Sequence, residues 1–377
     1  MTVAGAGGEA TAEVSGVPAN GGRGQRVSLA DHTTLRLGGP AGTFVAAQDE
    51  RDVVDAVRAA DASGEPLLIL GGGSNVVVAD AGFAGTVVHV ATRGVDIRWD
   101  RGDRGAALLR AAAGENWDAI VARCVAEGLA GVECLAGIPG LVGATPIQNV
   151  GAYGQEVAET VAGVRVLDRR AGRVVTLDGA ACGFGYRTSM FKRRPGRFVI
   201  LDVTFKLDNE RPPPPIRYAE LASSLGVVAG QRVPAGKVRA AVLELRRGKA
   251  MVLDPADPDT RSAGSFFTNP VLGPDQLAAF EDAVRRRLGH GASFPRFPAS
   301  GGNVKIPAAW LIERAGFCKG YAACGARISS RHPLALTNPG GATTAGLLAL
   351  AREIRDSVQD AFGVTLVAEP VLVGVQL

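Results

Sequence analysis

The chain has 377 residues, of which 46% are apolar and 21% are charged, and its formal net charge is +4. This length allows two or three domains, and the arginines form no long basic run with aromatics between them, which argues against nucleic-acid binding. Five cysteines without a Cys-x-x-Cys pair, four separated histidines and the lack of a long apolar run exclude a disulfide framework, a zinc site and a membrane span, so we expect a cytoplasmic protein.

The first predicted elements form a small α/β unit. Residues 1–25 hold almost no large apolar side chain, and we expect a disordered leader there. Strand-like runs follow at 33–37 and 43–46. Asp49 is then placed to cap a helix that Gly64 ends.

Three consecutive glycines lie between a buried strand at 67–70 and a β-branched run at 76–78, which predicts a second strand. Without Cβ atoms, successive glycine N–H groups can form a concave nest for a phosphate, and the next two side chains add donors. A dinucleotide-binding loop would open a helix here, and a Walker A loop would end in Gly-Lys-Ser or Gly-Lys-Thr. The alternative interpretation is a tight connection between two strands. The residues concerned are Gly71, Gly72, Gly73, Ser74 and Asn75.

A second region begins with a strand at 106–113 and a helix whose apolar face starts at Trp117. The stretch at 131–157 is so rich in glycine and proline that it precludes a long regular element. Such a long, mostly apolar loop needs a partner to cover it, and a flat ring system would serve. Strands are predicted at 164–167 and 174–177.

The last region is mainly helical. Alternating apolar residues predict a half-buried strand at 201–207, and four prolines at 212–215 then mark a boundary or a stiff crossover. Helices are predicted near 237–247, 276–288 and 345–362, the last of them clearly amphipathic.

Three polar side chains stand where the local pattern gives no structural need for them. Arg187, in CGFGYRTSMFK, could clamp a carboxylate with two hydrogen bonds, or it is merely solvated. Ser265, in AGSFFTNP, could give a proton to a carbanion, or it is a turn serine. Glu369 lies in a closing strand predicted at 364–375, where a buried carboxylate is a candidate functional acid and a water-facing edge glutamate is the alternative.

Taken together, these segments resemble the UDP-N-acetylenolpyruvoylglucosamine reductase (MurB) family of bacterial cell-wall synthesis. The similarity covers nearly the whole chain after the leader, and its motifs are LILGGGSN, AGENW, LAGIPGLVGATPIQNVGAYG, CGFGYRTSMFK, AGSFFTNP, AAWLIERAGFCKG, RHPLALTN and EPVLVG. Each motif alone is weak, but so many in this order make a specific resemblance. The chain departs from the family at 320–325, where GYAACG replaces the more common glycine pair.

The resemblance implies an α+β protein with a vanillyl-alcohol-oxidase-type (PCMH-like) FAD-binding fold of two α/β subdomains and a C-terminal α+β substrate domain. The predicted boundaries are a leader at 1–25, subdomains at 26–90 and 91–230, a substrate domain at 231–363 and a closing strand at 364–377. The implied reaction is the reduction of UDP-N-acetylglucosamine enolpyruvate to UDP-N-acetylmuramate in peptidoglycan precursor synthesis, with non-covalent FAD and with NADPH as co-substrate. We expect a monomer that binds neither nucleic acid nor a membrane.

The resemblance also implies residue roles. Arg187 would lie at the substrate carboxylate, Ser265 would protonate the carbanionic carbon after hydride transfer from flavin N5, and Glu369 would polarise the same end of the substrate. The five residues of GGGSN would hold the FAD diphosphate. The other cofactor-binding residues expected are Ile138, Pro139, Gly143, Ala144, Thr145, Asn149 and Gly151. The substrate-binding residues expected are Tyr186, Tyr218, Lys249 and Asn269, with Tyr218 on a loop that closes over the UDP group.

Two other functions stay open. The first is a FAD-linked oxidase of the same fold, in which His32 or His89 would tether the flavin. The second is a redox-silent nucleotide-sugar-binding protein that keeps only the glycine nest.

Overall fold

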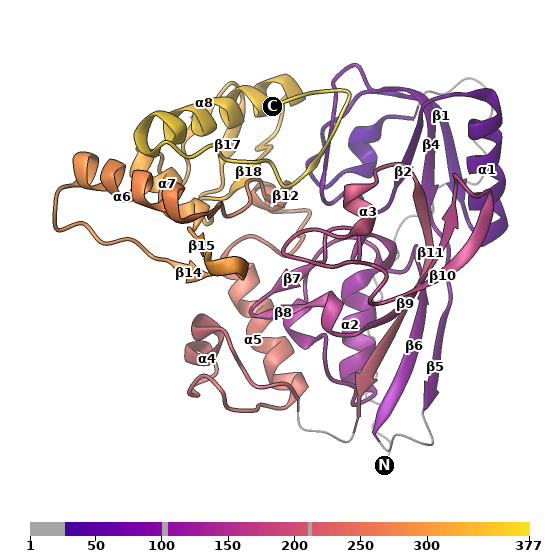
Figure 1. Ribbon diagram of the computed structural model, residues 1–377. Helices are drawn as coiled ribbons and strands as arrows, with labels where there is room; N and C mark the ends of the chain where they lie inside the picture. The colour runs from indigo at the N-terminus through magenta and orange to yellow at the C-terminus, as the bar shows by residue number, and fades with distance from the viewer. Residues whose placement is uncertain (1–26, 100–104, 210–212) are drawn as a thin grey trace, which may run out of the picture.

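A three-stranded parallel sheet near the N-terminus, covered by one helix, is the first unit of the fold (Figure 1). The structure is a computed structural model that describes residues 27–99, 105–209 and 213–377, so the predicted leader lies outside the described residues. The strand order is β1-β4-β2. The elements of this unit are β1 (Ala41–Ala47), α1 (Glu50–Ser63), β2 (Leu67–Leu70) and β4 (Phe83–Val90).

Helix α1 begins and ends where its sequence predicts. Asp49 accepts a hydrogen bond from the N–H of Asp52, whose carboxylate accepts one from the N–H of Asp49 in return. At the other end Gly64 has a φ of 71°, in the left-handed region that glycine adopts at low cost. Val53 and Val57 are fully buried. Burial of each valine stabilises the fold by about 1.5 kcal/mol or more, so packing contributes more than the cap does.

The second unit is a five-stranded antiparallel sheet with the order β10-β9-β11-β6-β5. Its strands are β5 (Val95–Trp99), β6 (Ala106–Ala112), β9 (Val161–Asp168), β10 (Arg173–Asp178) and β11 (Phe198–Asp208). Helices α2 (Trp117–Ala126) and α5 (Ala235–Gly248) contact each other. One hydrophobic core includes α1, both helices and this sheet, so the first two units fold around shared side chains.

The alternation predicted at 201–207 is wrong at Asp202, which is buried on β11. Its carboxylate lies 2.7 Å from the guanidinium of Arg110 and 3.1 Å from that of Arg165. Arg165 also pairs with Glu50 of α1 at 2.5 Å. Because two cations compensate the buried carboxylate, a polar residue is stable at this position. These contacts hold α1 against the second sheet.

The C-terminal unit, coloured orange to yellow in Figure 1, packs beside the first two units and has its own hydrophobic core. Its strands are β12 (Ser262–Ser265), β13 (Val271–Leu272), β14 (Phe297–Pro298), β15 (Val304–Lys305), β16 (Ala322–Ala323), β17 (Ala326–Ile328) and β18 (Ala335–Thr337). Its helices are α6 (Pro274–Leu288), α7 (Ala308–Ala315) and α8 (Thr344–Phe362). The three helices predicted in the last region of the sequence are thus confirmed as α5, α6 and α8.

The strand predicted at 33–37 is wrong. The chain forms a 3-10 helix at Leu29–His32 and then turns, with Arg36 at a φ of 54°. The Thr33 hydroxyl donates to the carbonyl of Leu37 at 2.9 Å, and such a side-chain bond competes with strand pairing.

The closing strand predicted at 364–375 is much shorter than expected. Only Val371–Val373 forms a strand, β19, which pairs in parallel with β3 (Val76–Val78). Pro370 has no N–H to offer a ladder, and the N–H of Glu369 donates to the carbonyl of Phe266 at 2.9 Å. The chain therefore returns from the C-terminal unit to the residues that follow the glycine loop.

Short elements complete the described part of the chain. These are β7 (Gly151–Ala152), β8 (Gln155–Glu156), α3 (Met190–Arg193), α4 (Ala219–Ser224) and the 3-10 turns Glu133–Leu135, Val142–Ala144, Val157–Glu159, Pro258–Thr260 and Ser300–Gly302.

Candidate active site

A cavity of about 320 Å³ lies between the glycine loop, the loop at 138–151 and the C-terminal unit. It is mostly apolar with a few polar groups, as is usual for a site that binds a small molecule, and the part where Glu369 meets Arg187 and Gln148 is its polar corner. The predicted site residues that line it are Gly71, Gly72, Gly73, Ser74, Asn75, Ile138, Pro139, Ala144, Thr145, Gly151, Arg187, Ser265 and Glu369. The fold thus brings together the three candidate catalytic residues, which are far apart in the sequence.

The glycine loop needs its glycines because backbone packs against it. A Cβ on Gly73 would lie 1.9 Å from the carbonyl oxygen of His32, and one on Gly72 would lie 2.9 Å from the Cα of Gly140. No described residue accepts a hydrogen bond from the backbone N–H groups of residues 71–75. β3 follows directly, so the prediction of a strand after the loop is confirmed. The unused N–H groups make this loop a suitable anion-binding nest.

The two polar side chains of the glycine loop contact protein groups. The Ser74 hydroxyl donates to the carbonyl of Pro139 at 3.0 Å, and the Asn75 amide donates to Gln148 Oε1 at 2.6 Å. Both bonds join the glycine loop to the loop at 138–151. In this arrangement the backbone, rather than these side chains, presents the donors that an anion would meet.

Arg187 lies in a tight turn at the polar corner of the cavity. Gly185 and Thr188 exchange two backbone hydrogen bonds, and Arg187 between them has a φ of 51°, a conformation that costs a non-glycine residue about 1 kcal/mol. Its Nη2 donates to the carbonyl of Gly151 at 2.6 Å and its Nη1 to that of Asn149 at 3.5 Å. The loop at 138–151 therefore holds the guanidinium, which is not merely solvated.

Glu369 is the acid at the same corner, and it does not face water. Its side chain is 14% exposed, its Oε1 lies 3.4 Å from Nε of Arg187, and Gln148 Nε2 donates to the same oxygen at 3.3 Å. Burial raises the pKa of Glu369, while the positive charges of Arg187 and Lys192 oppose that rise. A carboxyl with a raised pKa is typical of a functional acid.

Ser265 is the last residue of β12, where it pairs with Ala335 of β18. The fully buried ring of Phe266 and that of Phe267, with centroids 5.1 Å apart, anchor the chain just after it. The Ser265 hydroxyl makes no hydrogen bond to a described residue, although the residue lines the cavity. Its backbone is thus fixed while its hydroxyl remains available, which a turn serine would not offer.

Two predicted cofactor-binding residues do not line the cavity. The N–H of Gly143 donates to Ala113 O at 2.9 Å, and a Cβ at Gly143 would lie 2.6 Å from that of Ala113. Asn149 is buried at a φ of 50°, and its amide donates to Glu156 and to the carbonyl of Gly185. Both residues shape the loop at 138–151 from behind.

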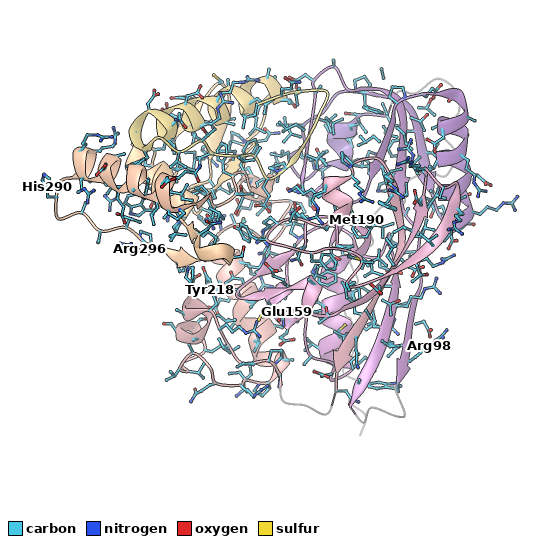
Figure 2. All side chains as sticks on the ribbon, in the orientation of Figure 1. Arg98, Glu159, Met190, Tyr218, His290 and Arg296 are labelled. Carbon is cyan, nitrogen blue, oxygen red and sulfur yellow. The ribbon has the colours of Figure 1, made fainter. Side chains whose placement is uncertain are left out.

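The four predicted substrate-binding residues also lie outside this cavity. Tyr186 and Asn269 line an adjoining hollow of about 830 Å³, and Arg187 borders both spaces. Tyr218, labelled in Figure 2, is 45% exposed at the start of α4, and its ring meets that of Tyr153 edge-on. Lys249 pairs with Glu220 of α4 at 2.7 Å and lies 5.8 Å from the centre of the Tyr153 ring. Tyr153, Tyr218, Glu220 and Lys249 thus form a separate cluster between α4 and α5.

Sequence reasoning missed three polar residues that line the cavity, namely Gln148, Lys192 and Arg246. Gln148 connects Asn75 to Glu369, and Arg246 is buried with its Nη2 donating to the carbonyl of Met251 at 2.8 Å. A signal existed for two of them. Gln148 is a polar residue inside an apolar loop, and Lys192 lies in the same motif as Arg187.

The two histidines that could have tethered a flavin lie elsewhere. His32 and His89, with ring centroids 5.3 Å apart, line a different hollow behind Gly71 and Gly72. Burial lowers the pKa of His89 to about 4. Neither histidine lines the cavity that holds Ser265. This placement gives no support to the oxidase with a histidine tether.

Two kinds of feature are absent from the described residues. Among them no group of three or more histidine, cysteine or acidic side chains is arranged to hold a metal ion. No helix in the described part of the chain is long and apolar enough to cross a membrane.

Two family models match separate parts of the chain, one in the N-terminal half and one in the C-terminal unit. Residues 41–178 match the model of a FAD binding domain, and residues 255–373 match that of the C-terminal domain of UDP-N-acetylenolpyruvoylglucosamine reductase. The reductase of Thermobifida fusca is 58% identical, over 94% of this chain and 98% of that protein. The reductase of Streptomyces coelicolor is 57% identical, over 93% of this chain and 90% of that protein.

A solved structure agrees in fold. The reductase (MurB) from Thermus caldophilus superimposes with a TM-score of 0.61 at 24% identity, over 93% of this chain and 98% of that one. The mixed α/β fold, with a FAD-binding domain followed by the reductase-type C-terminal domain, is therefore confirmed.

Proposed function

Because the chain belongs to the UDP-N-acetylenolpyruvoylglucosamine reductase (MurB) family, we propose that the cavity at Arg187, Ser265 and Glu369 is its active site. The protein is a FAD-dependent, NADPH-consuming oxidoreductase of peptidoglycan precursor synthesis, a UDP-N-acetylmuramate dehydrogenase. Its substrate is the enolpyruvyl ether of UDP-N-acetylglucosamine, and its product is UDP-N-acetylmuramate.

The residues of the cavity fit FAD. The five N–H groups of the glycine loop that donate to no described residue suit a diphosphate, and the apolar walls at Ile138, Pro139 and Leu141 suit ring systems. We assign the diphosphate to residues 71–75 and the remaining contacts to the loop at 138–151. When bound, FAD supplies the hydride that the substrate receives. Gly143 and Asn149 contribute by holding that loop in place.

Ser265 is the proposed proton donor. Reduction of the enolpyruvyl double bond leaves negative charge on the carbon next to the carboxylate, and that carbon needs a proton. The Ser265 hydroxyl faces the cavity with no described hydrogen-bond partner, and β12 fixes its backbone. A donor held in position in this way typically contributes a factor of about 100 or more to the rate.

Arg187 and Glu369 stabilise the acid end of the substrate in this proposal. Arg187 supplies positive charge for the carboxylate, where charge accumulates as the carbanion forms. Glu369, with its pKa raised by burial, acts in its neutral form and donates a hydrogen bond to the same end. The 3.4 Å separation between Nε of Arg187 and Oε1 of Glu369 is the observation that best supports this pairing of roles.

The nucleotide end would extend out of the cavity past Tyr186 and Asn269, which line the adjoining hollow. Tyr218 and Lys249, on the cluster between α4 and α5, would then contact the UDP group. The exposed ring of Tyr218 leaves it free to turn toward a ligand, and Lys249 carries a charge that suits a diphosphate.

The test is an anaerobic titration followed through the flavin spectrum. NADPH should bleach the flavin absorbance, and the enolpyruvyl substrate should then restore it without oxygen. Restoration by oxygen alone would favour an oxidase, and a colourless protein that takes up no FAD would favour a redox-silent binding protein.

Three further expectations remain proposals. We propose a monomer, because residues from a single chain complete the cavity, and light scattering of the purified protein would test it. We place the enzyme in the cytoplasm, where NADPH and nucleotide sugars are available. The domain boundaries at 26–90, 91–230, 231–363 and 364–377 also stay proposals, which limited proteolysis would test.

A further inference from the structure

Lys192 is a cation in the cavity to which neither the fold nor the proposed mechanism has yet given a role. It lies on the short helix α3 and lines the same space as Arg187, Ser265 and Glu369. Its side chain is half-buried, and its ammonium group has no hydrogen bond or ion pair with a described residue. The charge of Glu369 favours the charged ammonium, but a partly buried ammonium that donates no hydrogen bond is costly unless a ligand supplies an acceptor.

The backbone of Lys192 is held firmly. Ser189, fully buried, caps α3 by accepting from the N–H of Lys192, and its hydroxyl donates to the carbonyl of Ile147. Phe191 is buried and meets Phe198 edge-on, with ring centroids 5.9 Å apart. Met190, labelled in Figure 2, is the first residue of this helix. The ammonium is therefore carried into the cavity on a fixed support.

Arg187 alone leaves the corner short of free positive charge. Three nitrogens of its guanidinium already face protein acceptors, namely the carbonyls of Asn149 and Gly151 and the carboxylate of Glu369. A substrate carboxylate brings its own negative charge into this largely apolar cavity, which is unfavourable unless a cation that is free to pair with it lies close by. The charged and polar groups at this corner of the cavity are Arg187, Lys192, Glu369 and Gln148, and Tyr186 acts on it from the adjoining hollow.

We propose that Lys192 binds the carboxylate of the substrate's enolpyruvyl group, as the second cation of the corner that Arg187 and Glu369 form. This proposal rests on the proposed function of the same cavity. Three observations carry it: the Lys192 ammonium donates to no described acceptor, the Arg187 guanidinium is occupied, and helix α3 is fixed. Lys192 thereby makes the site selective for the acid over a similar nucleotide sugar that lacks this carboxylate.

The experiment compares two ligands on the oxidised holoenzyme. UDP-N-acetylmuramate carries the carboxylate, and UDP-N-acetylglucosamine lacks it, so the ratio of their dissociation constants isolates recognition of the acid. Lys192→Met should weaken binding of UDP-N-acetylmuramate by about 10- to 100-fold, because a hydrogen bond between charged groups is lost. Binding of UDP-N-acetylglucosamine should stay unchanged, and Lys192→Arg should retain most of the preference for the acid.

Arg194→Met is the matched control, because it removes one positive charge at the end of the same helix without touching the cavity. Equal losses for both ligands in Lys192→Met, or no loss for either, would overturn the assignment. If Lys192→Met does not retain FAD, Lys192→Gln makes the same comparison with a side chain of similar length.

Arg187→Met separates the two levels of the argument. If Arg187→Met loses the preference for the acid while Lys192→Met keeps it, only the role of Lys192 fails. If neither variant changes that preference, the corner is not the site of the carboxylate and the proposed function of the cavity fails with it.

Discussion

Arg187 Nε lies 3.4 Å from Glu369 Oε1, although the two residues are far apart in the sequence. Arg187 follows strand β10, and Glu369 follows the last helix, α8. The same guanidinium reaches the carbonyls of Gly151 and Asn149. One side chain therefore links the loop proposed to cover the cofactor with the acid of the C-terminal unit. Charge and hydrogen-bond geometry at this residue should both matter for catalysis.

Arg187→Lys should lower kcat/KM by about 100-fold, since one ammonium cannot reproduce the three contacts of the guanidinium. Steady-state kinetics with NADPH and the enolpyruvyl substrate would measure this. Lys237→Arg, on the exposed face of α5, is the control for an exchange between lysine and arginine away from the cavity. Turnover close to that of the wild type would remove Arg187 from the mechanism.

Ser265→Ala should leave reduction of the flavin by NADPH intact and slow its reoxidation by the substrate by about 100-fold or more, because only the second half-reaction needs the proton. Anaerobic stopped-flow absorbance separates the two half-reactions. Ser262→Ala, at the other end of β12, is a suitable comparison because Ser262 is not a lining residue of the cavity. Equal impairment of both phases would argue against proton donation.

Glu369 should make the folded state less stable as the pH rises. Because its pKa is raised in the folded protein, the native state binds more protons than the unfolded chain at pH values just above the ordinary glutamate pKa of about 4.3. Stability from this group is present below that pH and is lost as the pH rises through the folded-state pKa. The melting temperature of Glu369→Gln, relative to that of the wild type, should therefore increase as the pH rises above about 4.3, and thermal denaturation at a series of pH values would measure it.

Glu244→Gln provides the reference for that comparison, since Glu244 is exposed on α5. A difference between wild type and Glu369→Gln that does not vary with pH would show that Glu369 titrates alike in the folded and unfolded states.

Gly73→Ala should destabilise the flavin-free protein by about 2 kcal/mol, because the new Cβ meets the backbone of His32 and φ is 60°. Gly71→Ala is its matched control, since a Cβ there has only ordinary van der Waals contacts, the nearest at 3.8 Å. Urea denaturation of both variants would measure the difference. Equal stability of the two variants would mean that the loop can shift away from His32.

The sequence predicted the regular elements well where one local rule decided the outcome. Helix α1 begins after Asp49 and ends before Gly64, as expected. A strand follows the triple glycine, as predicted, and not the helix of a dinucleotide-binding loop. Sequence motifs also located Arg187, Ser265 and Glu369, whose proximity follows only from the fold. The family resemblance, rather than local chemistry, linked those three residues beforehand.

Long-range contacts account for what the sequence did not predict. Asp202 looks like an outward-facing residue of an alternating strand, but Arg110 and Arg165 make its burial possible. The run at 33–37 has strand-like residues, yet Leu35 and Leu37 pack into the C-terminal core. The side chain of Gln148 is positioned by hydrogen bonds to Asn75 and Glu369, which lie on either side of it. In each case the partner is remote in sequence and no local pattern identifies it.

The parallel pairing of β3 with β19 has a consequence for the order of assembly. While the ribosome is still making α8, β3 has no strand partner among the described residues, and Glu369 has not yet been added to the chain. A nascent chain can thus complete its first sheet early, but the cavity proposed to bind the flavin is complete only after Val371–Val373 has emerged and docked. Shortened products that stop before this point should be recognised by the quality-control machinery as unfinished, because an unpaired strand remains open beside the glycines.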